Sequence, residues 1–163
     1  MVASVNYYGG FYVGRYEVSI NENKAQSKRD IVSASSEERS AGTWYGLYAL
    51  CKTYKANSVK SNMICGSQYN AMLTWMGTDI TNFDVNDRNT TTKTGTVEKD
   101  KIKNVYDLGG CKHEWTLTAV SSSLRVAYGG CRYDDDLPGD ELSTVPTNSV
   151  DDFGSRLALY IEL

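Results

Sequence analysis

The pattern of hydrophobic and polar residues predicts a strand near the beginning of the chain. Residues 11–20, FYVGRYEVSI, mix aromatic and β-branched side chains without a helical period, and they follow the pair Gly9-Gly10. The residues after this segment, 21–34, are mostly polar and predict a loop.

Two helices are expected next. The first begins with a capping-box pattern, Ser35 with Glu38 three positions later, in which each side chain can satisfy a backbone donor of the first turn. Its apolar face consists of Trp44, Leu47, Tyr48, Cys51 and Tyr54. The second helix is expected over residues 67–76, with Gly77 as its stop. Its apolar stripe, which we expect to pack in the core, is Tyr69, Met72, Leu73 and Met76.

The rest of the chain alternates between long polar segments and short β-like pieces. The expected strands are Val105–Leu108, Glu114–Thr118, Arg125–Tyr128 and Leu157–Ile161. The glycine pairs at 109–110 and 129–130 punctuate them and can supply turn positions of positive φ. Residues 77–103 and 132–155 have no period and predict long irregular loops. The pattern predicts an α+β fold, with two helices, short antiparallel strands and long loops, in one domain spanning residues 1–163.

The charge distribution excludes some classes of partner. The net charge is −3, and from Asp134 to the end eight acidic residues stand against one arginine, so this last fifth of the chain carries −7. Nucleic acid is therefore not an expected partner, because phosphate binding needs a basic face. The apolar runs are also too short for membrane insertion.

The four cysteines do not match a known zinc-ligand spacing. Cys51, Cys65, Cys111 and Cys131 form no CxxC pair, and the single histidine, His113, does not complete a ligand set in the sequence. We therefore expect no metal site and mostly buried thiols, and leave open whether Cys111 and Cys131 pair.

Three ordered motifs resemble a known family. VYDLGGCKHEWT at 105–116, RVAYGGCRY at 125–133 and FGSRLALYI at 153–161 are similar to framework segments of formylglycine-generating-enzyme-like domains, which have a C-type-lectin-like fold. The resemblance covers nearly the whole chain. It implies that Glu114 and Trp115 belong to the framework, with Glu114 bound to buried backbone or to an arginine such as Arg156.

These versions of the motifs look most like variable proteins of diversity-generating retroelements. In that group, a template copied with errors at adenines rewrites the C-terminal part of the domain. Such proteins are similar to phage-tail receptor-binding proteins and bacterial surface adhesins. The resemblance implies a C-terminal module of a longer protein, located on a virion or a bacterial cell surface, with oligomers formed through the parent protein.

The composition of the expected variable region, residues 112–155, fits this resemblance. Residues 128–155 contain no Lys, Gln, Met or Trp, and nearly all of their side chains are reachable by changing the adenines of an asparagine codon. Glu141 is the exception and would belong to the framework. The expected ligand-binding residues are His113, Tyr128, Arg132, Tyr133, Asp134, Asp135, Asp136, Leu137, Asp140 and Asp152. Tyrosine and arginine favour a binding surface, and the expected ligand is a cell-surface protein or glycan receptor.

Catalysis is the main alternative to binding. The family's oxidases bind copper through two cysteines that follow the GGS motif, whereas here Cys131 lies inside the motif and no cysteine follows it. A lone soft ligand without a thiolate or imidazole partner is a poor copper site, so we expect no enzyme activity and no catalytic residue. A virion assembly module is the other alternative.

The acidic run allows one cofactor to be considered. Residues 134–136, with Asp140 and Glu141, offer the oxygen ligands that calcium prefers, but they lack the EF-hand spacing. We interpret the run as a solvated acidic loop that binds no cofactor, and we keep calcium as the alternative.

Overall fold

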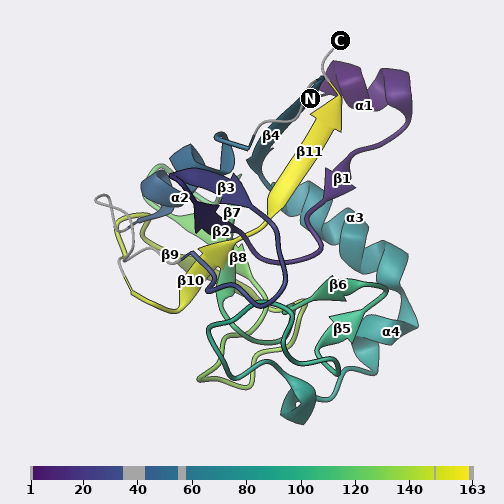
Figure 1. Ribbon diagram of the computed structural model, residues 1–163, viewed down its shortest axis with the longest axis vertical. Coiled ribbons are helices and arrows are strands. Elements are labelled where there is room, and N and C mark those ends of the chain that lie inside the picture. Colours follow the sequence, from purple (N-terminus) through teal and green to yellow (C-terminus); the bar gives the residue numbers. More distant parts are fainter. Residues whose placement is uncertain (1, 35–42, 55–57, 149, 162–163) are drawn as a thin grey trace.

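The computed structural model describes residues 2–34, 43–54, 58–148 and 150–161, and it shows an α+β fold (Figure 1). The helices are α1 (Val2–Tyr8), α2 (Trp44–Cys51), α3 (Gly66–Met76), α4 (Thr78–Thr81) and the 3₁₀ turn η2 (Val85–Asp87). No helix in the described ranges combines the length and the apolarity needed to cross a membrane.

In the described residues, the strands form two small sheets and two hairpins. The three-stranded sheet has the order β1-β11-β4, formed by β1 (Tyr12–Val13), β11 (Leu157–Ile161) and β4 (Val59–Met63). The four-stranded sheet has the order β10-β7-β8-β9, formed by β10 (Phe153–Ser155), β7 (His113–Ala119), β8 (Arg125–Tyr128) and β9 (Glu141–Thr144). The hairpins pair β2 (Ser19–Asn21) with β3 (Lys24–Gln26), and β5 (Lys101–Ile102) with β6 (Val105–Tyr106). Most pairs are antiparallel as expected, but β10 and β7 are parallel.

The N-terminal segment differs from its prediction in two ways. The strand expected over residues 11–20 is divided into β1 and β2, which belong to different sheets. The loop expected over residues 21–34 was wrong in part, because β3 folds back on β2. Glu22 and Asn23 make this turn, each with a positive φ angle. The polar turn therefore concealed a hairpin, and in its second strand, β3, only Ala25 is buried.

Both predicted helices are present. The capping box at Ser35 and Glu38 lies outside the described residues, and the described helix α2 begins at Trp44 after Thr43. Trp44, Leu47 and Cys51 are buried as expected, whereas Tyr54 lies beyond the end of the helix.

Helix α3 closely matches its prediction. It ends at Gly77, and Tyr69, Met72 and Met76 of the expected stripe are buried. Its first turn is capped by Gln68, whose side chain accepts a hydrogen bond from the backbone N–H of Cys65 at 3.0 Å.

Strands β4, β5, β9 and β10, like β3, were missing from the sequence prediction. Strand β4, VKSNM, is polar at most positions, and it is ordered by pairing along its whole length with β11. Strands β9 and β10 lie inside the loop expected over residues 132–155, and α4, η2 and β5 lie inside the one expected over 77–103. These strands are specified by their partners in the sheets rather than by a hydrophobic period of their own.

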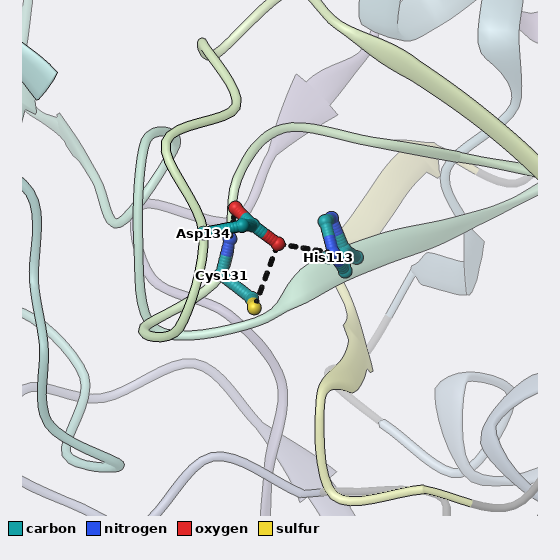
Figure 2. Close-up of side chains that lie close together, drawn as sticks. All are labelled: His113, Cys131 and Asp134. Carbon is teal, nitrogen blue, oxygen red and sulfur yellow. Dashed lines mark hydrogen bonds and ion pairs between the residues drawn. The ribbon is translucent and has the colours of Figure 1, made fainter.

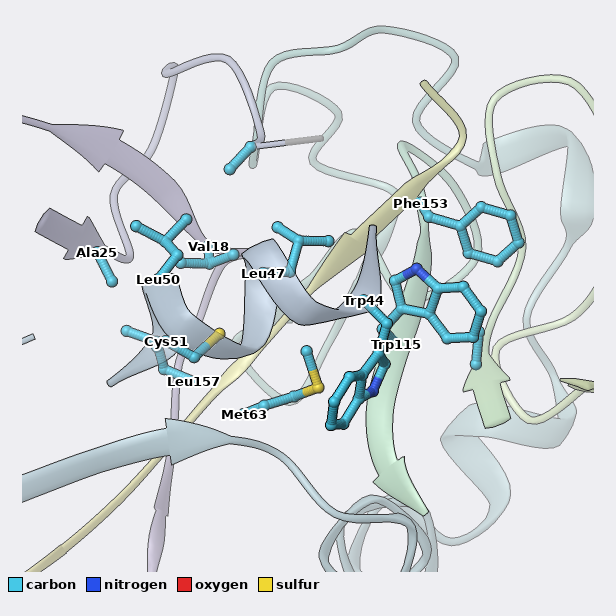
Figure 3. Close-up of a cluster of buried hydrophobic side chains, with 12 residues drawn as sticks. Val18, Ala25, Trp44, Leu47, Leu50, Cys51, Met63, Trp115, Phe153 and Leu157 are labelled. Carbon is cyan, nitrogen blue, oxygen red and sulfur yellow. The ribbon is translucent and has the colours of Figure 1, made fainter. Parts of the chain in front are cut away.

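The first hydrophobic cluster lies between α2 and the strands around Trp115 (Figure 3). Trp115 is fully buried and its ring stacks on Phe153, with ring centroids 4.6 Å apart. The indole N–H of Trp44 donates a hydrogen bond to the carbonyl oxygen of Thr116 at 2.7 Å, which fixes the beginning of α2 to β7.

A second cluster joins α3 to the four-stranded sheet. The rings of Tyr69 and Tyr128 stack with their centroids 4.5 Å apart. Val126, Leu108 and Met72 are buried in the same cluster. Helix α3 therefore covers the side of β8 that bears Tyr128.

A buried ion pair lies between β7 and β11, next to both clusters. The Arg156 guanidinium donates to both carboxylate oxygens of Glu114 from Nε, each at 3.0 Å, and a further nitrogen also donates to Glu114. Its remaining donors reach the carbonyl oxygens of Gly14 at 2.8 Å and Tyr106 at 2.7 Å. The prediction that Glu114 binds Arg156 is confirmed. The guanidinium thus joins four separate segments of the chain.

We predict that Arg156→Met lowers the free energy of unfolding by about 3–5 kcal/mol, because it leaves the Glu114 carboxylate buried without its partner. Lys93→Met is the matched control, since its ion pair with Asp30 at 3.2 Å is exposed and should contribute about 1 kcal/mol or less. Urea denaturation of both variants measures the difference. Equal losses in the two variants would contradict the assignment.

Candidate functional site

The candidate site is the segment that leaves β8 at Gly129 and returns at β10. Gly129 has a φ angle of +78°. A Cβ atom on Gly130 would lie 2.4 Å from the carbonyl oxygen of Asp136 and 2.5 Å from that of Gly109. Only glycine fits so close an approach of backbone, and the segment therefore begins from a fixed position. Neither Gly109 nor Gly110 has a positive φ angle. Glycine is required at these two positions by close packing instead, because a Cβ atom would not fit at either.

Several large hydrophobic side chains of this segment are exposed. Tyr133 is 69% exposed, Leu137 46% and Val145 45%. Asp135 and Asp140 of the same segment are also exposed. Scattered apolar side chains are normal on a protein surface, but several on one loop, bordered by carboxylates, are typical of a binding surface. We call Tyr133, Asp135, Leu137 and Val145 the display surface.

Two of the expected contact residues are buried. His113 is 6% exposed and Tyr128 is 3% exposed. The Tyr128 hydroxyl donates to the Glu141 carboxylate at 2.6 Å and accepts from Asn70 at 3.3 Å. The expectation that these two side chains contact a ligand at the surface does not fit their positions, because both point into the framework beneath the loop.

Arg132 supports the surface rather than projecting from it. Its side chain is only 7% exposed, it forms an ion pair with Asp151, and it lies 4.0 Å from Asp152. The guanidinium carbon lies 4.3 Å from the centroid of the Tyr133 ring, and a guanidinium nitrogen donates to the Tyr133 hydroxyl at 3.0 Å. Arg132 therefore orients the exposed Tyr133 ring.

Sequence reasoning did not single out Lys112 and Asp151 as a pair. The Lys112 side chain is 1% exposed, and its ammonium donates to the Asp151 carboxylate at 2.7 Å. Partial burial opposes ionisation of Asp151, but the hydrogen bond from Lys112 and the charges of Lys112 and Arg132 outweigh it and lower the pKa of Asp151. The pair could have been predicted from the position of Lys112 within a framework motif, because a buried lysine almost always has a partner.

The acidic run is less solvated than the sequence predicts. The Asp134 Oδ1 atom accepts from the backbone N–H groups of Cys131 at 3.0 Å and Asp136 at 3.3 Å. Asp140 accepts from the backbone N–H of Leu137 at 2.8 Å. Of these residues, Asp135 remains largely exposed, 3.2 Å from Arg88. Asp134 and Asp140 therefore shape the loop, and their carboxylates are directed at its own backbone.

His113, Cys131 and Asp134 form a compact cluster beneath the loop (Figure 2). The Asp134 Oδ2 atom lies 2.9 Å from His113 Nε2 and accepts from Cys131 Sγ at 3.0 Å. The premise that Cys131 lacks an imidazole partner was therefore wrong, because folding brings His113 to it.

The four cysteines are all free thiols, so Cys111 and Cys131 do not pair. Burial, together with the hydrogen bond to Asp134, raises the pKa of Cys131 to about 12.

Comparison with known proteins identifies the fold of the chain. No family model matches the chain, and neither does any curated protein sequence. Treponema denticola variable protein 1 has a similar structure, with a TM-score of 0.53 and 17% identity over 86% of this chain and 74% of that one. The crystal structure of CarF aligns with a TM-score of 0.55 and 11% identity, over 94% of this chain and 75% of that one. The chain has the C-type-lectin-like fold of the formylglycine-generating-enzyme type.

In this C-type-lectin-like domain the framework motifs coincide with the buried residues. Glu114, Trp115 and Arg156 are each 1% exposed or less, while the segment between β8 and β10 carries the display surface. Similar structures at such low identity are expected when the buried framework determines the fold and the loops differ.

We predict that Asp151→Asn lowers the free energy of unfolding by about 1–2 kcal/mol at neutral pH, because it leaves the buried Lys112 ammonium without a carboxylate. Asp151 has a lowered pKa in the folded state. Its contribution is therefore complete above its unfolded pKa of about 3.9 and disappears as the pH falls further.

The difference between wild type and variant should accordingly shrink below about pH 4, as measured by urea denaturation across a pH series. Asp135→Asn is the control, since the Asp135 side chain is 79% exposed. A difference that persists undiminished at low pH would exclude the ion pair as its source.

Proposed function

We propose that the chain is a non-catalytic ligand-binding domain that displays a replaceable surface on a lectin-like framework. The observation that carries this proposal is the separation of roles along residues 131–152. The backbone is held by Gly130, Asp134 and Asp140, whereas the display surface side chains point outward. Changes at those positions would alter the chemistry presented, and the side-chain contacts that they would remove are those of Asp135 with Arg88 and of Tyr133 with Arg132.

The chemistry of the surface favours a receptor with an apolar site and positive charge. Tyr133 is already oriented by Arg132, so less side-chain entropy is lost when it packs against a partner. The net charge of −7 from Asp134 onward would accelerate association with a cationic patch. The proposed partner is a protein or glycan exposed on a cell, and the proposed location is a phage tail or a bacterial cell surface.

Diversification by a retroelement would account for the composition of this segment. The side chains of the display surface are all reachable from an asparagine codon by changes at adenine, and Glu141, which is not, bonds to Tyr128 of the framework. The fold shared with Treponema denticola variable protein 1 supports this reading.

A second candidate, an assembly module, rests on a different surface. A pocket of about 420 Å³ near the N-terminus is lined by apolar residues that include Phe11, Met72 and the exposed Tyr12 and Trp75. Such a surface could pack against another subunit. It lies on β1 and α3, and it uses no residue of the display surface.

We predict that Tyr133→Ser weakens binding to the receptor at least about tenfold, because an exposed, preorganised tyrosine is a typical centre of binding energy. A labelled tetramer of the domain, applied to panels of bacterial cells and immobilised glycans, would identify binding and measure the loss. Tyr12→Ser is the matched control, since Tyr12 is similarly exposed, at 62%, in another part of the molecule.

The two variants also separate the candidate functions. Loss of binding in Tyr133→Ser alone supports the display surface. If Tyr12→Ser instead abolishes self-association measured by light scattering, while Tyr133→Ser changes neither property, the assembly module is the better account.

A further inference from the structure

The cluster of His113, Cys131 and Asp134 has the composition of a transition-metal site. Its three candidate ligand atoms all lie within 4.8 Å of one another. They are an imidazole nitrogen, a sulfur and a carboxylate oxygen, which is the set that zinc binds in proteins. They come from β7 and from the loop that follows β8, two segments that the sequence alone does not connect (Figure 2).

The hydrogen bond on the far side of the imidazole selects the tautomer that a metal requires. His113 Nδ1 lies 2.7 Å from the carbonyl oxygen of Gly129. A carbonyl oxygen only accepts, so His113 Nδ1 carries a hydrogen, and Nε2 is the ring nitrogen that faces Asp134. In metal-binding histidines, the N–H of the second ring nitrogen commonly donates a hydrogen bond to a carbonyl oxygen in this way.

The contact between His113 and Asp134 also needs a positive group. In the neutral imidazole, the Nε2 lone pair would face the Asp134 Oδ2 atom at 2.9 Å, and two acceptors repel each other. A positive charge placed between the two atoms would relieve this repulsion. A metal ion would satisfy Nε2, Oδ2 and the Cys131 sulfur together.

The surroundings hold each ligand in place. Asp134 Oδ1 is fixed by two backbone N–H groups, which leaves Oδ2 for the metal. The backbone N–H of Tyr133 points at the Cys131 sulfur at 3.4 Å, a contact that favours a thiolate. The Asp134 side chain is 34% exposed, so a fourth position would be open to water.

We propose that His113, Cys131 and Asp134 bind one Zn²⁺ ion. Zinc bonds of 2.0–2.3 Å place tetrahedral ligands roughly 3.3–3.7 Å apart, so the observed separations of 2.9 and 3.0 Å would widen by less than about 1 Å. On binding, the Cys131 S–H bond is replaced by a Zn–S bond and the proton is released to solvent, and the ion ties the base of the display surface to β7. The site does not depend on the identity of any receptor.

The test is titration of the reduced, metal-free protein with Zn²⁺ and, separately, with Co²⁺ as a spectroscopic probe. We expect one Zn²⁺ per chain, a Tm that rises with zinc concentration, and a Co²⁺ complex with a thiolate-to-metal absorption band. Cys131→Ser should abolish that band, and both Cys131→Ser and His113→Gln should weaken Zn²⁺ binding at least about tenfold.

Cys65→Ser is the matched control, because Cys65 is a free thiol outside the cluster, and its Zn²⁺ affinity should equal that of the wild type. Circular dichroism establishes that each variant is folded. Asp134→Asn keeps an oxygen that can accept from the loop backbone but removes the negative charge, and this variant should also bind Zn²⁺ more weakly than the wild type. Absence of stoichiometric binding by the wild type, or binding unchanged in Cys131→Ser and His113→Gln, would overturn the proposal.

Discussion

The buried pair of Glu114 and Arg156 is the interaction on which the rest of the structure depends. Arg156 supplies hydrogen bonds to β7, to the chain at Gly14 and to the end of β6 at Tyr106. Strand β7 belongs to the four-stranded sheet, Gly14 directly follows β1 of the three-stranded sheet, and β6 belongs to a hairpin, so the pair ties these three parts of the fold together. Removing two charges from water is costly, and here nearly every donor and acceptor finds a partner. Trp115 directly follows Glu114 in the sequence, and its side chain is part of the first hydrophobic cluster.

With the sheets fixed in this way, the segment between β8 and β10 is free to carry a surface. Its backbone is anchored at Gly129 and Gly130, and the carboxylates of Asp134 and Asp140 satisfy its own N–H groups. Strand β9 adds a ladder to β8 along its length. The exposed side chains consequently contribute little to the stability of the fold. The proposed binding function relies on these same side chains.

Sequence patterns predicted the features that depend on local periodicity or on strong motifs. Helix α3, strands β7, β8 and β11, and the Glu114–Arg156 pair followed from them. Strand β4 did not, because its polar residues form a strand only against β11. His113 and Tyr128 were expected at the surface but are buried. Their burial arises from the loop that folds over them, which the local sequence pattern does not show. The His113, Cys131 and Asp134 cluster was also missed, because it assembles from two strand ends with no ligand spacing in the sequence.

The central claim is that framework and display surface are energetically separate. A protease-stability scan of all substitutions in a display library, compared between Tyr133, Asp135, Leu137 and Val145 and the framework residues Glu114, Trp115 and Arg156, measures it directly. We predict that most substitutions at the first group change the free energy of unfolding by no more than about 0.5 kcal/mol, while most at the second lower it by about 3 kcal/mol or more. Comparable losses in the two groups would contradict it.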